Sequence, residues 1–81
     1  MNKFERRYRN EIVEFGKRLR KLRESKSLSQ WDIELASGIN RTEISRIENG
    51  QKNIEFITVV KLAVALERGS DSNVKFLFVE H

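Results

Sequence analysis

Apolar residues recur at helical spacing through the first third of the chain. Successive members of this set are four, four, three, four and three residues apart: Phe4, Tyr8, Ile12, Phe15, Leu19 and Leu22. Steps of three and four keep side chains on one face of an α-helix. We therefore predict a long amphipathic first helix. Its inner part begins the domain core, which we place at residues 12–66.

Residues 1–11 are predicted to form a basic N-terminal extension of this helix. Phe4 and Tyr8 carry the apolar pattern outward, and the extension allows two interpretations, a loosely packed tail or a contact with a partner. Arg6, Arg7 and Arg9 could touch a DNA backbone, although a solvated run of charges is the more ordinary interpretation.

Residues 28–50 are typical of two short helices joined by a tight turn. Ser29 precedes Asp32 by three residues, and Asn40 stands in the same relation to Glu43. Each pair can cap a helix N-terminus with a side-chain oxygen and an acid. Gly38 permits the positive φ of a sharp reversal, and a second glycine, at position 50, can end the second helix. This combination predicts a helix-turn-helix.

The second of these helices has two chemically different faces. At about 100° per residue, Ile44 and Ile47 point inward together with Glu48. The opposite face carries donors and hydroxyls and no acid: Arg41, Thr42, Ser45, Arg46 and Asn49. Such a face suits base edges and phosphates in a DNA major groove, whereas a solvated surface is the ordinary alternative. The caps, the turn and the isoleucine spacing together favour a recognition helix.

The run from Phe15 to Leu66 resembles the Xre/Cro/phage-repressor helix-turn-helix family. The resemblance lies in Leu28-Ser29-Gln30, Gly38, the run 41–44, Ile47-Glu48 and Gly50, with further matches at Gly16, Leu19, Leu22-Arg23, Ile33 and Leu62-Ala63. It implies an all-α, compact five-helix domain that binds operator DNA, usually as a dimer. The chain departs from the family at Glu34, where a small alanine is usual, and at Trp31. Glu34 would have to open the contact between the helices or find a cation.

The resemblance and the face pattern together assign site residues. The base-contacting set is Arg41, Thr42, Ser45 and Arg46. The phosphate-contacting set is Gln30, Trp31, Asn49, Lys52 and Asn53. Arg23 borders the apolar stripe of the first helix, and Glu48 points into the core. Because an inward carboxylate is costly without a cation, we expect these two to form a structural ion pair, which the resemblance also implies.

The last third of the chain predicts a further helix and an apolar tail. Asn53 can cap a helix from Ile54 to about Leu66, with a core stripe formed by Phe56, Val59, Leu62, Ala63 and Leu66. A second apolar line contains Ile57, Val60 and Val64. The tail, residues 70–81, contains Phe76 and Phe78 within VKFLFV, a run that suits a strand paired with a second copy. The family resemblance implies the alternative, a short fifth helix. We predict a homodimer interface that combines the second apolar line with the two tail phenylalanines.

Composition narrows the possible functions. The 81 residues fit one domain, and residues 1–24 hold nine Lys/Arg against four Glu, a net charge of +5 within a total of +4. A basic segment attracts nucleic acid, which we prefer to a membrane because the apolar residues are needed for a core. The chain has no cysteine and one histidine, at position 81, and a mean hydropathy of −0.58. We expect no metal, no cofactor, no membrane anchor and a cytoplasmic location.

These observations predict a small transcriptional regulator rather than an enzyme. No glycine-rich phosphate loop or His-Glu-x-x-His pattern is present. The leading hypothesis is a repressor-like homodimer that binds double-stranded DNA at a near-palindromic operator. The alternative is an antitoxin or other protein-interaction module that neutralises a toxin partner through the tail or the N-terminal extension. Operator sequence, and activation against repression, do not follow from the residues.

Overall fold

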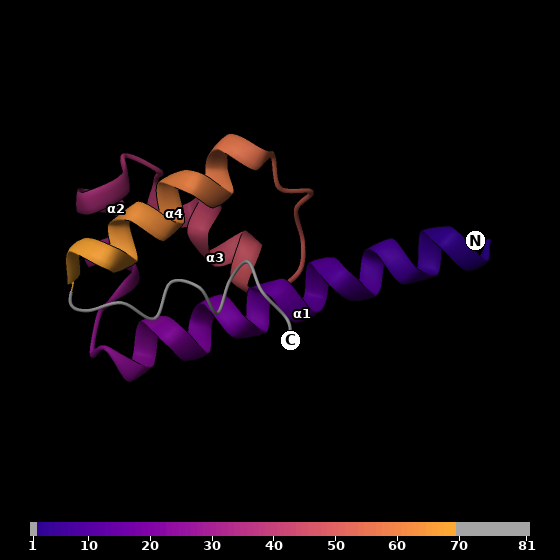
Figure 1. Ribbon diagram of the computed structural model, residues 1–81, viewed down its shortest axis with the longest axis horizontal. Helices are drawn as coiled ribbons and strands as arrows, with labels where there is room; N and C mark the ends of the chain where they lie inside the picture. The colour runs from indigo at the N-terminus through magenta and orange to yellow at the C-terminus, as the bar shows by residue number, and fades with distance from the viewer. Residues whose placement is uncertain (1, 70–81) are drawn as a thin grey trace.

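The computed structural model describes residues 2–69, which form four α-helices. They are α1 (Lys3–Ser25), α2 (Gln30–Ser37), α3 (Arg41–Glu48) and α4 (Phe56–Gly69). The short helices α2 and α3 gather with α4 over the C-terminal half of α1, while the N-terminal half of α1 projects away from them (Figure 1). The predicted long first helix and the helix-turn-helix are therefore both present.

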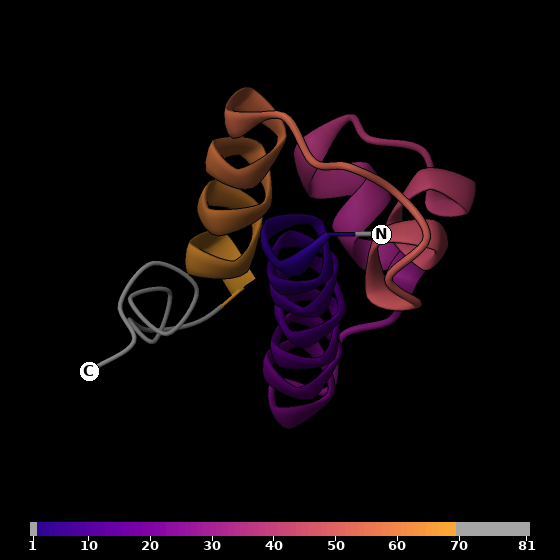
Figure 2. The ribbon, with the colours of Figure 1, turned by 90° about the vertical axis from the view of Figure 1, so that its right-hand side faces the viewer.

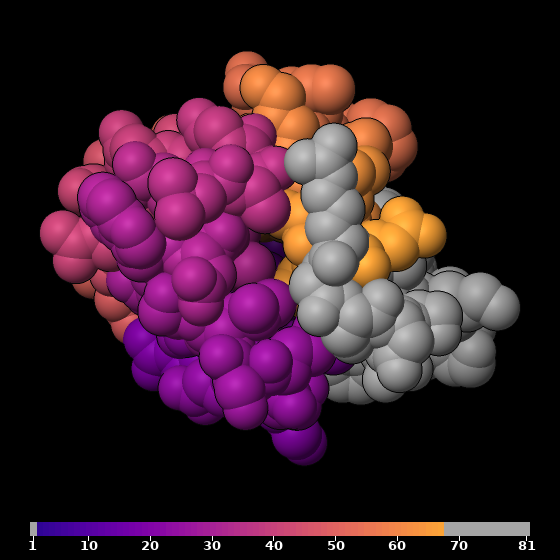
Figure 3. Space-filling model, turned by 90° about the vertical axis from the view of Figure 1, so that its left-hand side faces the viewer, coloured from indigo at the N-terminus to yellow at the C-terminus, as the bar shows by residue number. Residues whose placement is uncertain are grey.

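One apolar core joins the four helices. Its fully buried side chains come from every helix: Leu19, Ile33, Ile44, Ile47, Leu62 and Leu66. Viewed along α1, α4 lies on one side of this helix, and α2 and α3 lie on the other (Figure 2). In the space-filling view, α2 and the C-terminal part of α1 form a continuous surface beside α4 (Figure 3). Phe4 and Tyr8 lie outside this core and are 63% and 62% exposed.

The predicted caps and turns define the ends of α2 and α3. Ser29 and Asp32 form a reciprocal capping box at the start of α2, and the Asn40 side chain accepts from the Glu43 amide at 2.9 Å. Gly38 ends α2 with φ of +79°. After α3, Gly50 has φ of +70°, and the Gln51 amide donates to the Arg46 carbonyl at 2.8 Å. This bond and the one from the Gly50 amide to Ile47 complete a Schellman motif.

The start of α4 differs from the prediction. The helix begins at Phe56, and the Glu55 carbonyl, two residues after Asn53, accepts the first amides, those of Thr58 and Val59. Asn53 is therefore not the cap. Phe56 is 76% exposed, so its assignment to the core stripe is wrong; Ile54, in the loop before α4, packs against the core instead. Thr58 and Ala65 are buried in addition to the predicted Leu62, Ala63 and Leu66.

The predicted fifth element falls outside the described part of the chain. Residues 2–69 contain four helices and no strand, so they supply neither the fifth helix nor the strand that the tail pattern allows. Phe76 and Phe78 belong to residues 70–81 and lie beyond this region. Among the described residues, no helix is long and apolar enough to span a membrane.

Candidate nucleic-acid interface

The two faces of α3 separate in the structure as their chemistry predicts. Ile44 and Ile47 have no exposed surface, and Glu48 is 4% exposed. Arg41, Thr42, Arg46 and Asn49 are exposed, and Ser45 is half-buried. The isoleucines anchor the helix in the core, so the outward face presents two guanidinium groups, two hydroxyls and an amide. These groups can donate to base edges and to phosphate oxygens.

Glu48 fastens α3 to α1 and α2. Its carboxylate accepts from Arg23 Nε at 2.7 Å and Arg23 Nη2 at 3.0 Å, so the expected partners lie together in a bidentate ion pair. Two further donors reach Oε1, Arg20 Nε at 3.3 Å and Gln30 Nε2 at 3.0 Å. Arg23 also donates to the Leu28 carbonyl at 2.7 Å, which ties the end of α1 to the entry of α2.

The electrostatics of this cluster favour the charged forms. Burial alone would raise the pKa of the Glu48 carboxyl. The hydrogen bonds from Arg23, Gln30 and Arg20, with the positive charge of Arg23, outweigh burial and lower that pKa below its ordinary value. The hydrogen bond to Glu48 raises the pKa of the Arg23 guanidinium against the opposing effect of its own burial.

Glu34, which replaces the small alanine usual in the family, forms a hydrogen bond that the sequence did not predict. Within residues 2–69 no cation forms an ion pair with this carboxylate; instead Oε1 accepts from the Arg41 backbone amide at 2.8 Å. The first amides of a helix lack intrahelical partners and lie at the positive end of the helix dipole. Glu34 therefore acts as a second capping group at the start of α3, beside Asn40.

The predicted phosphate-contacting residues differ in their exposure and in the contacts that they already make within the chain. Trp31 is 54% exposed, and Asn49 and Asn53 are also exposed. Gln30 is half-buried, with its amide nitrogen on Glu48, and Lys52 Nζ lies 3.9 Å from a Glu43 carboxylate oxygen. Asn49 accepts from Arg20 Nη2 at 3.1 Å. All five residues lie at the ends of α2 and α3 or in the following loop.

The sequence did not predict two of the side chains that donate to Glu48, those of Arg20 and Gln30. Arg20 lies one helical turn before Arg23 on α1, so its spacing could have indicated a second cation on the same face. Gln30 belongs to a different helix, and no local pattern connects it to Glu48. Among residues 2–69, no three His, Cys, Asp or Glu side chains come together as a metal site.

The second apolar line of α4 is largely uncovered by the described residues. Ile57 is 55% exposed, Val64 is 41% exposed, and Val60 is half-buried. Phe56 extends this surface at the start of the helix. Thus α4 has one apolar face in the core and a second apolar face that residues 2–69 leave largely exposed.

The chain is similar to known regulators in both sequence and structure. A family model described as helix-turn-helix matches residues 19–71. The control protein C.MunI of Mycoplasma sp is 36% identical over 55 residues, which cover 67% of this chain and 74% of the relative. The transcriptional repressor RghR of Bacillus subtilis is 43% identical over 54 residues, which cover 65% of this chain and 40% of the relative.

A solved structure matches the fold over most of both chains. It is the restriction-modification controller protein C.AhdI from Aeromonas hydrophila, with a TM-score of 0.74 and 38% identity. The match covers 85% of this chain and 98% of that chain. Because the family model covers more than half of the residues and agrees with the capped α2–α3 unit, this chain belongs to the Xre/Cro-type helix-turn-helix family of DNA-binding transcriptional regulators.

Proposed function

We propose that this protein binds a near-palindromic operator in double-stranded DNA as a homodimer, with α3 in the major groove. The observation that carries the proposal is the division of α3, in which Ile44 and Ile47 are fully buried while Arg41, Thr42 and Arg46 remain exposed. Two copies would place their α3 helices in successive major grooves, roughly 34 Å apart.

Within the groove, each exposed group has a role that fits its chemistry. Arg41 and Arg46 can each donate two hydrogen bonds to a guanine, and Thr42 can pack its methyl group on a thymine. Ser45, between them on the same face, can donate to or accept from a base edge. Five residues around this face would bind phosphates: Gln30, Trp31, Asn49, Lys52 and Asn53. Such phosphate contacts would set the orientation of α3 on the duplex.

The similarity to two controller proteins supports a regulator of that general kind. The control protein C.MunI is 36% identical over the aligned residues, and the restriction-modification controller C.AhdI shares the fold with 38% identity. We therefore propose that the protein regulates transcription from a promoter that contains its operator.

Selection of bound duplexes from a random pool tests this proposal. We expect an enriched motif with two-fold symmetry and half-sites one helical turn apart, about 10 base pairs. Recovery of an asymmetric motif would contradict the dimeric arrangement. Failure of the purified chain to retain any duplex at low salt would overturn DNA binding itself.

A second function is favoured by the exposed apolar surface of α4. Ile57 and Val64 suit a protein partner as well as a second copy, so an antitoxin that neutralises a toxin is the alternative. Sedimentation of the isolated protein distinguishes the two. A stable dimer would favour the regulator, whereas a monomer would favour an antitoxin that lacks its partner.

A further inference from the structure

Three exposed arginines of α1 lie on one side of the helix. Arg9 and Arg20 are eleven residues apart, which is three turns plus about 20°, so they share one side. Arg6 lies about one turn before Arg9 on the same side. Arg7 and Arg18 lie about 160° and 180° around the helix from Arg9, on the opposite side. Arg7 is exposed and Arg18 is half-buried. The side that carries Arg6, Arg9 and Arg20 is called the arginine row below.

The arginine row follows α3 and the loop after it. Gly16, on this side of α1, lies so close to α3 that a Cβ there would collide with the Ile47 carbonyl oxygen. Val13 packs on Gly50, since a Cβ on that glycine would lie 2.9 Å from Val13 Cγ2. Arg20 donates to Asn49 at the exposed end of α3. The row therefore starts beside the proposed DNA-binding face and continues outward past residues 50–53.

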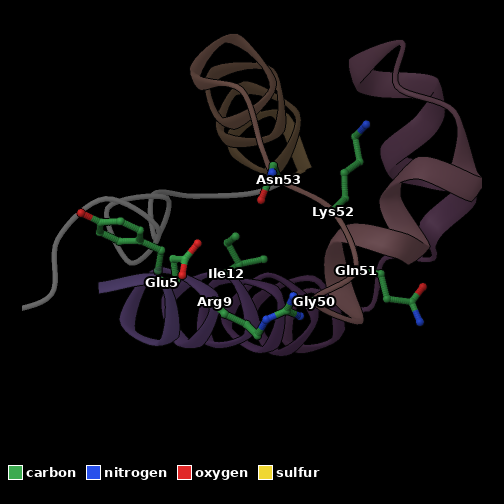
Figure 4. A pocket seen from close by; sticks show the side chains of 8 residues that line it. Glu5, Arg9, Ile12, Gly50, Gln51, Lys52 and Asn53 are labelled. Atoms are coloured by element: carbon green, nitrogen blue, oxygen red, sulfur yellow. The ribbon is translucent and has the colours of Figure 1, made fainter. Parts of the chain in front are cut away.

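Arg9 faces a hollow that also contains proposed phosphate ligands. The hollow has a volume of about 420 Å³ and lies between the extension of α1 and the α3–α4 loop. Arg9 shares its lining with Gln51, Lys52 and Asn53, and its side chain extends along α1 toward Gly50 (Figure 4). Glu5 is the acid in this lining, and its carboxylate accepts from the Asn2 amide at 3.0 Å.

The outer members of the row are available for a ligand. Within residues 2–69, the guanidinium groups of Arg6 and Arg9 have no ion-pair or hydrogen-bond partner, and both residues are exposed. Guanidinium groups bind phosphate oxygens through paired hydrogen bonds, and they do so at low desolvation cost. A row that continues from Asn49 and Lys52 thus has the charge and the position to follow a DNA strand.

We infer that Arg6 and Arg9 bind backbone phosphates of duplex DNA beyond the segment that α3 contacts, so that the N-terminal extension of α1 lengthens the DNA-binding surface. This inference rests on the proposed function, because it assumes that α3 docks on DNA. The contact is independent of base sequence, and it should appear as a contribution to the salt dependence of binding rather than to sequence preference.

The test compares two double variants of the full-length chain. R6Q/R9Q removes two charges from the arginine row, whereas R7Q/R18Q removes two charges from the opposite side of the same helix. Binding to a mixed-sequence duplex is measured between about 50 and 200 mM salt, with the slope falling by about 0.9 for each lost phosphate contact. We expect R6Q/R9Q to lower the slope by about 1.8. The wild-type protein should then lose about twelvefold more affinity than R6Q/R9Q across this range.

The matched control separates a directed contact from a general effect of charge. R7Q/R18Q should keep the wild-type slope, and equal changes in both variants would overturn the inference. An unchanged slope in R6Q/R9Q would show the row to be solvated, and loss of the dimer in sedimentation of R6Q/R9Q would make it a subunit contact. If instead the wild-type protein bound no duplex, the proposed function would fail, which is a different result from any difference between the variants.

Discussion

Glu48 has a side chain with no exposed surface, yet it carries a charge because donors from two other helices surround it. Its neighbours are not equivalent. The Arg23 side chain is 11% exposed and makes a bidentate contact, while the Arg20 side chain is 45% exposed and reaches one oxygen at 3.3 Å. At the residue scale, Arg23 is therefore the main partner of the buried Glu48 carboxylate, and Arg20 is a weaker one.

Replacement of Arg23 should destabilise the protein strongly. Arg23→Ala would leave the buried carboxylate with only Arg20 and Gln30, and loss of one partner of a buried pair costs about 3–5 kcal/mol. Urea unfolding would measure the free energy of unfolding. Arg20→Ala is the control, with an expected cost of about 1 kcal/mol or less because that side chain is nearly half exposed. Similar losses in the two variants would contradict the dominant role of Arg23.

The lowered pKa of Glu48 also predicts a pH dependence of stability. A carboxyl whose pKa is lower in the folded than in the unfolded state contributes stability above its unfolded pKa, about 4.3. That contribution is lost as the pH falls toward the folded value. Between about pH 5 and pH 3, Glu48→Gln should therefore show a shallower fall in unfolding free energy than the wild-type protein. Glu67→Gln, on the exposed surface of α4, controls for loss of one acid, and an unaltered fall in E48Q would contradict this account.

Base reading and phosphate binding should separate in two single variants. Arg46→Ala should cost about 1–3 kcal/mol on the preferred duplex and relax the preference at one base pair. Lys52→Ala should weaken all duplexes equally and reduce the salt slope by about one. Titration of the selected operator and its single-base variants would measure both effects. Equal weakening of every duplex by R46A would remove Arg46 from the base-reading set.

At the scale of the elements, α3 is positioned by close contact with α1 as well as by its caps. Gly16 leaves no space for a side chain, because a Cβ would meet the Ile47 carbonyl and lie 2.8 Å from the Glu48 carbonyl. Both oxygens belong to the backbone of α3 and can move only with the helix. The same approach brings Arg23 within reach of Glu48, so the glycine and the ion pair depend on each other.

Gly16→Ala should change the free energy of unfolding through two effects of opposite sign. Helix propensity alone would stabilise α1 by about 1 kcal/mol, whereas steric overlap with the last turn of α3 would cost about 1–3 kcal/mol. We expect net destabilisation and weaker DNA binding, measured by thermal unfolding and by operator titration. A rise in the melting temperature would contradict the close contact between α1 and α3.

At the scale of the whole molecule, α4 faces the core on one side and presents Ile57, Val60 and Val64 on another. Homodimer formation through this line is a proposal, and its consequence is that two α3 helices bind one operator together. The N-terminal part of α1 projects from the opposite end of the fold from α2 (Figure 1), so a row of phosphate contacts there would extend the footprint of each subunit.

Charge placed on the apolar line should prevent the proposed homodimer from forming without unfolding the subunit. Ile57→Asp with Val64→Asp is expected to give a monomer in sedimentation, with retained helical circular dichroism and greatly weakened operator binding. Leu35→Asp, at a position on α2 that is 71% exposed, is the matched control and should remain dimeric. A dimeric double variant would move the subunit contact away from this surface.

Short-range chemistry made much of the fold predictable. The caps at Ser29 and Asn40, the positive φ of Gly38 and Gly50, and the two faces of α3 each depend on residues within a few positions of one another. Such features follow from helix geometry and hydrogen bonding alone, and the structure confirms them. The start of α4 was not predicted correctly: Asn53 has a side chain suited to a cap, yet the helix begins at Phe56 and the Glu55 carbonyl accepts its first amides.

The amino-acid sequence by itself determined that α3 has an apolar side and a cationic, hydroxyl-bearing side, because periodicity assigns each residue to a face. Only the tertiary structure decided that Glu48 has three side-chain partners, that Glu34 caps α3, and that Phe56 lies in solvent while Ile54 packs inside. These outcomes depend on how close separate helices approach and in which direction, and such distances between segments are set by the packing of the whole core.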